Sequence, residues 1–344
     1  MGIGNKELEV QGGATIKGTE PRGAPTPWGT LGRRVGQSSA SLALGVFLVA
    51  EVVVFIFATP YFWHVENIIN MLTTVAVIGI VAAPGTLLIV GGQIDLSVGS
   101  GAGLVGVILG YFAPHTGLPL AIILAAAIGL LAGAVNGFIV SVIGVNSLIT
   151  TLGTLAVYGG IAEVLSNGQT IAITSFDGLA TARPFLRLPI PVLLMFGTLL
   201  CFWVLMTYTT YGRSMYAVGG NPVAARLVGI ASKRVTFIAF VLSAAAFTLG
   251  GFVLSSQLSA GSPTFGVNLE LAVITAVILG GTSLSGGRGT IVGTALGVLI
   301  IGVLGNGLVL MNVNSFWQDV ANGLLLIAAV SFDRLRLRLA GREQ

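Results

Sequence analysis

The residue types that most often carry catalysis are scarce in this sequence and widely spaced. Its two histidines, His64 and His115, have no Cys, Asp or Glu at the spacing of metal ligands. The only cysteine, Cys201, lies inside an apolar run and has no partner for an intramolecular disulfide bond. We therefore expect no catalytic centre, no metal site and no cofactor, with each histidine in or near a loop at the membrane interface.

Two glycine patterns are relevant to nucleotide binding. A phosphate-binding loop has the form Gly-x-x-x-x-Gly-Lys-Ser/Thr, and none of the lysines follows such a glycine run. Gly101, Gly103 and Gly106 match Gly-x-Gly-x-x-Gly, but they lie in an apolar run with no strand before it. Close helix packing through small residues is the better interpretation. If ATP hydrolysis powers this protein, it must take place on another chain.

Acidic residues inside apolar runs could also do chemistry, because a charge in a membrane is costly and often marks function. Glu51 lies well inside the first apolar run. Two roles are open for it: a structural group hydrogen-bonded to a neighbouring helix, or the coupling acid of a proton-driven transporter. Asp95 falls at a predicted helix junction, where we expect Asp95 or Ser97 to cap the next helix.

The composition indicates that membrane helices position these residues. Of 344 residues, 54% are hydrophobic and 8% are charged, and the mean hydropathy is +0.97; a soluble domain carries roughly 25% charge. Apolar runs of about 20 residues recur, each long enough to cross a bilayer and apolar on every face, which excludes a transmembrane barrel. We predict an all-α polytopic membrane protein with about ten transmembrane helices. Their ranges are 40–58, 69–90, 98–112, 119–142, 147–165, 190–209, 235–256, 269–283, 290–309 and 317–332.

The basic residues predict the orientation of the chain. If the amino terminus is cytoplasmic, all of the 16 Lys and Arg residues except Arg183 and Arg187 lie inside. The net charge of +4 therefore indicates membrane orientation and contact with lipid, and no nucleic-acid partner. Both termini are predicted to be cytoplasmic. The predicted domains are a disordered tail at 1–37, a transmembrane domain at 38–332 with a cytoplasmic loop at 210–234, and a basic tail at 333–344.

The loop at 210–234 contains the most specific local pattern in the chain. A capping residue, a proline, helix formers and a terminating glycine follow one another within nine residues. This pattern predicts one short helix, which needs a surface to lie on. That surface is either a cytoplasmic partner or the membrane domain of the chain itself. The residues of this element are Asn221, Pro222, Ala224, Ala225, Arg226, Leu227 and Gly229.

Three glycine-rich runs, at 91–99, 216–230 and 280–290, occur in this order along the chain. Together they resemble the ribose/xylose-type monosaccharide permeases of bacterial ABC importers, and the resemblance covers about residues 40–332. It implies an inner-membrane permease that pairs with a second permease subunit, identical or different. It also implies two cytoplasmic ATPase subunits, which meet the short helix, and an extracytoplasmic sugar-binding protein. Six residues of these motifs are interpreted as structural: Gly91, Gly92, Asp95, Ser97, Gly280 and Gly281.

A path for a neutral sugar needs groups that pair with hydroxyls but carry no fixed charge. The uncharged polar residues inside or at the ends of the apolar runs meet this need. They are Asn136, Asn146, Thr150, Thr151, Ser255, Ser256, Gln257 and Asn306. Asn136 and Asn306 each precede a glycine and fit hydrogen bonding at helix packing contacts equally well.

The sequence therefore favours the permease subunit of an ATP-driven sugar importer. One alternative is a proton-coupled secondary transporter that uses Glu51. A transporter of this kind has no need of a capped cytoplasmic helix. The other is an ABC permease of the same architecture for nucleosides or branched-chain amino acids. The uncharged polar set suits a sugar better than a zwitterion.

Overall fold

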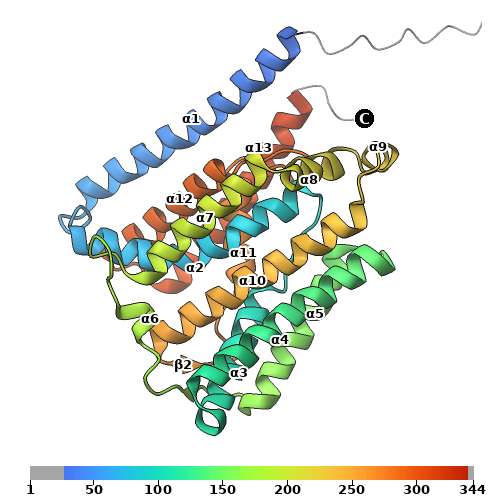
Figure 1. Cartoon of the computed structure of the whole chain (residues 1–344). Coiled ribbons are helices and arrows are strands. Elements are labelled where there is room, and N and C mark those ends of the chain that lie inside the picture. Colours follow the sequence, from blue (N-terminus) through green and yellow to red (C-terminus); the bar gives the residue numbers. More distant parts are fainter. Residues whose placement is uncertain (1–26, 340–344) are drawn as a thin grey trace, which may run out of the picture. The chain divides into compact units, whose positions relative to one another are not determined.

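A computed structural model describes the backbone of residues 27–339 and the side chains of residues 42–331 (Figure 1). The chain divides after Ser39, and the contacts below all belong to the part that begins at Ala40. Helices α1 (Pro27–Ala58), α2 (Val65–Val90) and α3 (Val98–Thr116) come first, followed by α4 (Leu118–Phe138), its π-helical continuation η1 (Ile139–Ile143) and α5 (Ser147–Ser166). The next elements are β1 (Ile171–Ala172), α6 (Gly178–Thr181), α7 (Ile190–Tyr208), α8 (Thr210–Gly220) and α9 (Pro222–Leu227). The remainder are α10 (Ser232–Leu258), β2 (Ala260–Gly261), α11 (Leu269–Leu279), α12 (Ile291–Leu310) and α13 (Ser315–Leu339).

The predicted all-α membrane class is confirmed, because a helix coincides with each predicted apolar run. Seven helices in the described part of the chain are long and apolar enough to cross a membrane. The number of crossings and the orientation of the termini stay predictions. Helix α1 begins at Pro27, so its first turns fall in the stretch that we expected to be a tail. The rest of that stretch, and residues 340–344 of the C-terminal tail, lie outside the described residues.

The range predicted for the eighth helix was wrong at its C-terminal end. We expected residues 269–283, but α11 ends at Leu279, where Gly280 and then Gly281, with φ of +85°, stop the helix. Its 11 residues are about 16 Å long, whereas the hydrocarbon core of a bilayer is about 30 Å thick. Helix α11 is therefore a half-length helix whose end must be covered by protein.

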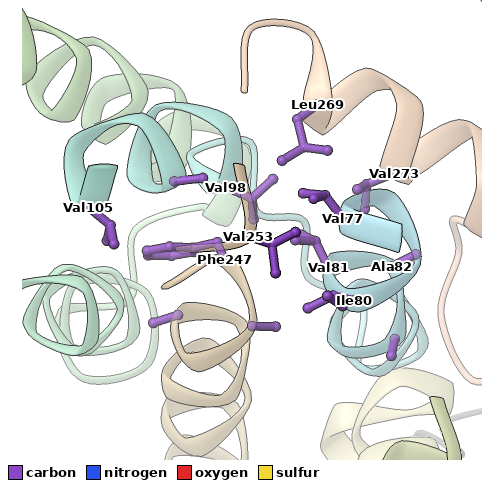
Figure 2. Close-up of a cluster of buried hydrophobic side chains, with 14 of the residues drawn as sticks. Val77, Ile80, Val81, Ala82, Val98, Val105, Phe247, Val253, Leu269 and Val273 are labelled. Carbon is purple, nitrogen blue, oxygen red and sulfur yellow. The ribbon is translucent and has the colours of Figure 1, made fainter. Parts of the chain in front are cut away.

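Helix α2 is the most enclosed helix of the bundle. It packs against α7, α10, α11 and α12, and it stays helical through the buried Pro84. The hydrophobic core includes side chains from α2, α3, α10 and α11 (Figure 2). Residues labelled there include Val77 and Val81 of α2, Val98 of α3, Phe247 of α10 and Val273 of α11. Helix α5, by contrast, packs mainly on α3 and is mostly exposed, as expected for the periphery of a membrane domain.

The glycine pattern of α3 serves helix packing. A Cβ atom on Gly101 would lie 2.8 Å from the ring of Phe247, and one on Gly106 would lie 2.6 Å from the Ser255 hydroxyl oxygen. Both neighbours belong to α10, so the two helices approach closely through these glycines. The interpretation of this motif as a packing face rather than a dinucleotide loop is confirmed.

Candidate functional site

The short helix predicted after Asn221 is present, with the predicted cap. The Asn221 side-chain oxygen accepts hydrogen bonds from the backbone N–H groups of Val223 (3.1 Å) and Ala224 (2.9 Å), and Pro222 is the first residue of α9. Its C-terminal end is closed as well. Gly229 has a φ of +83°, and the N–H of Ile230 donates to the Ala225 carbonyl at 3.0 Å. This pair of features is a Schellman motif, which satisfies the last carbonyls of a helix.

The loop also contains a helix that we did not predict. Helix α8 runs from Thr210 to Gly220, so the loop holds two short helices rather than one. Its several glycines argue against a helix by propensity alone, because each costs about 1 kcal/mol relative to alanine. The available signal was Thr209, whose hydroxyl oxygen accepts the backbone N–H of Gly212 at 3.1 Å and caps the helix.

The two faces of α9 differ in what they contact. Ala225 is 3% exposed and packs against its own chain, whereas Leu227 is 82% and Val228 76% exposed. Val223, one turn before Leu227, is exposed too. Of the two surfaces open for this helix, the chain itself is therefore the one that Ala225 contacts, and its side chain anchors α9 there. The outward apolar face of α9 consists of Val223, Leu227 and Val228, and we call it the docking face. Arg226 is exposed beside it, with its Nε donating to the Pro222 carbonyl at 3.1 Å.

The second and third glycine-rich motifs meet at the C-terminal end of α2, directly before the first motif. The N–H of Gly287 donates to the carbonyl of Val90, the last residue of α2, at 2.7 Å. Gly219 of α8 lies against the same pair. A Cβ atom there would collide with the Val90 carbonyl oxygen and lie 2.9 Å from the Gly287 nitrogen, closer than real Cβ atoms come. We call Val90, Gly219 and Gly287 the glycine junction. Close approach of three backbones is the reason for glycine at positions 219 and 287.

Side chains reinforce the glycine junction on either side. The Tyr216 hydroxyl of α8 donates to the carbonyl of Gly289 at 2.8 Å. The Met215 side chain, fully buried, covers Gly91 just after α2. Helix α8 is thus fixed both to the end of α2 and to the loop before α12. Because packed interfaces of this kind shift as units, a displacement of α9 would reach α2 through α8.

A buried polar network lies next to the junction, in the loop between α2 and α3. One carboxylate oxygen of Asp95 accepts the backbone N–H (3.0 Å) and the hydroxyl (2.7 Å) of Ser97, and the other accepts the Ser243 hydroxyl at 2.9 Å. The predicted side-chain cap on α3 is absent: Ser97 is the capping residue by position, but its side chain bonds Asp95 instead. Burial raises the pKa of Asp95, while these three donors lower it by a smaller amount.

The network continues into α4 and α5 through Asn136. Its amide nitrogen donates to the Ser97 hydroxyl at 2.8 Å, and its oxygen accepts the Tyr158 hydroxyl at 3.3 Å. Tyr158 also donates to the Ala132 carbonyl at 2.8 Å. Asn136 is completely buried, so its contacts are those of a packing residue. Ser243 and Tyr158 escaped notice because each lies on a different helix, far from the motif in sequence.

The other polar residues predicted near the α9 end of the bundle bond mainly to their own helix, and the Thr151 hydroxyl also lies 3.4 Å from the Ile94 carbonyl oxygen, to which it donates. Asn146 caps α5 by accepting the N–H groups of Leu148 (2.9 Å) and Ile149 (3.4 Å). Thr150 and Thr151 donate to the carbonyls four residues earlier, at 3.0 Å and 2.8 Å. Asn146 is exposed, and the two threonines are buried. The structure brings this group together on the first turns of α5.

The remaining predicted residues lie toward the opposite end. Ser255 is buried and its hydroxyl has no partner among the described residues. Ser256 donates to the Phe176 carbonyl, and Gln257 donates to the Thr73 carbonyl at 3.4 Å. Asn306 forms a reciprocal amide pair with Asn67, with nitrogen–oxygen distances of 2.8 Å and 2.9 Å. This pair joins α12 to α2 and was not visible from sequence, because Asn67 precedes its predicted helix.

Glu51 lies on α1 and is partly buried. Its Oε2 atom has no hydrogen-bond partner in the part of the chain that the structure describes. The structural role considered for Glu51 requires a hydrogen bond to a neighbouring helix. Its Oε2 atom does not form this hydrogen bond.

A bundle of membrane-length helices with a capped short helix fixed at one end fits the class of membrane transport permeases. The chain is a member of the family described as "Branched-chain amino acid transport system / permease component", which matches residues 67–330. It is a transporter subunit and not an enzyme, as predicted, and the family resemblance stated above is confirmed.

Several relatives match most of the chain. The ribose import permease protein RbsC of Bacillus subtilis (strain 168) is 40% identical over 299 residues, covering 85% of this chain and 91% of the relative. The L-arabinose transport system permease protein AraH of Escherichia coli (strain K12) is 36% identical over 328 residues, covering 92% and 96%. The probable ABC transporter permease protein YphD of Escherichia coli (strain K12) is 36% identical over 292 residues, covering 83% and 88%. No solved structure matches the chain.

Proposed function

We propose that this chain is the membrane-spanning subunit of an ATP-driven importer that carries a monosaccharide across the bacterial inner membrane. The relatives named as ribose and L-arabinose permeases support a pentose or a similar sugar as substrate. The proposed partners are a second permease subunit, two cytoplasmic ATPase subunits and an extracytoplasmic sugar-binding protein. The proposed orientation places both termini and α9 in the cytoplasm.

The docking face of α9 is the observation that carries this proposal. A six-residue helix is unstable in water by itself, yet α9 is capped at both ends and anchored through Ala225. Leu227 and Val228, at its C-terminal end, are apolar and largely exposed. A rigid helix that presents apolar side chains to water is typical of a protein interface. An ATPase subunit is the partner that an ABC permease needs at this end.

The mechanism follows from the attachment of α9. Closure of the ATPase subunits on ATP displaces the docking face, and α8 passes this displacement through the glycine junction to α2 and to the loop before α12. A change in the packing of α2 against α7, α10 and α12 then alternates the access to a central path. In this proposal Asn146 and Gln257 contribute to the path, while Asn136 and Asn306 hold helices together.

The experiment that tests this function is co-purification of the ATPase with Leu227→Glu. A glutamate on the docking face places a charge in an apolar contact, so we expect loss of the ATPase and of sugar uptake, with normal membrane insertion. Thr210→Glu is the matched control, because Thr210 is also exposed and lies in the same segment. Retention of both ATPase and uptake in Leu227→Glu would show that α9 is not the coupling element. Ala225→Glu is unsuitable, because it would disrupt the packing of the chain itself.

A further inference from the structure

A tight hairpin at residues 182–190 connects α6 to α7. The N–H of Ile190 donates to the Ala182 carbonyl at 3.1 Å, and the N–H of Leu188 donates to the Phe185 carbonyl at 2.9 Å. The two central residues of the turn, Leu186 and Arg187, have φ angles of +49° and +59°. Two positive φ angles define a type I′ turn, in which Asn, Asp and Gly are the favoured residues. Leucine and arginine are conformationally unfavourable there, and such strain is concentrated at functional sites.

The side chains of the hairpin are directed outward. Phe185 is 62% and Leu186 74% exposed, and Arg183 and Arg187 are exposed on either side of them. These two arginines are the only basic residues of the chain that the sequence places on the outer side. Positive charge is disfavoured on that side of a membrane protein. Its concentration within five residues, around two exposed apolar side chains, therefore calls for a functional reason.

The hairpin and α9 lie at opposite ends of α10 (Figure 1). Helix α9 precedes the first turn of α10, while the segment before the hairpin is tied to the last turns of α10 by Ser256. The Ser256 hydroxyl donates to the Phe176 carbonyl and accepts the N–H of Ala180 at 3.0 Å. A helix of 27 residues is about 40 Å long. If α9 meets the ATPase, the hairpin faces the outside.

We propose that this hairpin is the docking point for an extracytoplasmic protein whose acidic groups flank an apolar depression. The arginines would meet the acidic groups, and Phe185 and Leu186 would enter the depression. Arginine and aromatic side chains are the residues enriched at the centre of such interfaces. The proposal rests on the proposed function, in which a protein of this kind delivers the sugar to the permease.

An anionic membrane lipid is the other ligand to which the same charges could bind. Lipid headgroups are fluid and adapt to many backbone shapes, so they do not select a strained turn over a relaxed one. A folded protein surface does, because its acidic groups and its depression have fixed positions. The type I′ conformation at Leu186 and Arg187 therefore favours a protein partner.

The test uses the assembled transporter in nanodiscs of neutral phosphatidylcholine. The probe is the sugar-binding protein of the importer, loaded with its sugar and titrated while ATP hydrolysis is measured. For the double variant Arg183→Glu/Arg187→Glu we expect unchanged basal ATP hydrolysis. The concentration of binding protein that gives half-maximal stimulation of ATP hydrolysis should be at least tenfold higher than for the wild type. Leu186→Asn suits the turn better but removes the apolar contact, and it should raise this concentration severalfold. Val267→Asn is the matched control, because Val267 is similarly exposed in the loop after α10, and it should have no effect.

Each other outcome overturns a defined part of the proposal. If the binding protein stimulates ATP hydrolysis equally in the wild-type transporter and in both hairpin variants, the docking role is overturned. A defect that appears only when the nanodiscs contain phosphatidylglycerol assigns the hairpin to lipid and also overturns it. A wild-type chain that retains no ATPase overturns the proposed function together with the docking proposal.

Discussion

Substitution of Gly219 by alanine tests whether the glycine junction transmits movement. The added Cβ atom would lie 2.8 Å from the Val90 carbonyl carbon and 2.9 Å from the Gly287 nitrogen. Both are backbone atoms, so no flexible side chain can move aside. The hydrogen bond between Gly287 and Val90 must lengthen or break as α8 shifts.

The magnitude follows from three contributions. Overpacking of a close contact costs roughly 1–3 kcal/mol, and loss of the hydrogen bond costs about 1 kcal/mol. The better helix propensity of alanine returns about 0.5–1 kcal/mol. We therefore expect Gly219→Ala to destabilise the protein by about 1–3.5 kcal/mol and to displace α8 from the end of α2.

The assay combines thermal unfolding of the purified transporter with the ratio of sugar imported to ATP hydrolysed. Gly219→Ala should lower both the unfolding temperature and this ratio, while the ATPase stays bound because the docking face is unchanged. Gly220→Ala is the matched control: its Cβ atom would have Gly287 Cα, at 4.0 Å, as its nearest neighbour. If Gly219→Ala behaves like Gly220→Ala in both measurements, the glycine junction neither stabilises the protein nor couples ATP hydrolysis to sugar import.

Three further predictions concern buried polar groups. Because burial raises the pKa of Asp95, the ionised carboxylate destabilises the folded state, so stability should rise as the pH falls through the raised pKa toward the unfolded value near 4. In thermal unfolding measured across pH, Asp95→Asn should remove this contribution. An unchanged pH dependence in the variant would contradict the assignment. Asn306→Leu leaves the Asn67 side-chain oxygen without its partner, although the Asn67 amide nitrogen still donates to the Phe62 carbonyl at 2.9 Å, and it should cost about 1–2 kcal/mol. The double variant Asn67→Leu/Asn306→Leu should cost less than the sum of the two single variants, whereas simple additivity would argue against the pair. Glu51→Gln should leave uptake intact and insensitive to a protonophore at constant ATP; loss of uptake in the variant, with protonophore sensitivity in the wild type, would support a proton-coupling role instead.

The helices of the bundle could be predicted because the bilayer imposes long apolar runs, which are visible in any sequence. The cap at Asn221 and the terminating Gly229 were equally accessible, since capping depends on neighbours within one turn. The face of α9 that Ala225 occupies could not be predicted. Six residues are too few for a periodic pattern, and the surface that buries Ala225 comes from other parts of the chain.

The convergence of the motifs was beyond sequence reasoning for the same reason. Gly219 and Gly287 are far apart in the sequence, and nothing in their spacing indicates that both contact the Val90 carbonyl. Helix α8 was missed because tertiary contacts outweigh its glycine content. The buried network around Asp95 likewise draws Ser243 and Tyr158 from separate helices. Local patterns therefore predicted elements and caps, while the contacts that join them became visible only in three dimensions.

The half-length of α11 has a consequence for how the protein enters the membrane during synthesis. An 11-residue helix is too short to partition into the bilayer as an independent segment, and its C-terminal backbone groups would be left without partners in lipid. Its contacts with α12 solve this problem: a Cβ atom on Gly297 would lie 2.9 Å from the Ala276 carbonyl carbon, so the two backbones touch. Helices α11 and α12 must therefore leave the insertion machinery as a pair. A nascent chain that ends before Ile291 would leave the segment from Leu269 to Leu279 outside the hydrocarbon core, exposed to proteolysis.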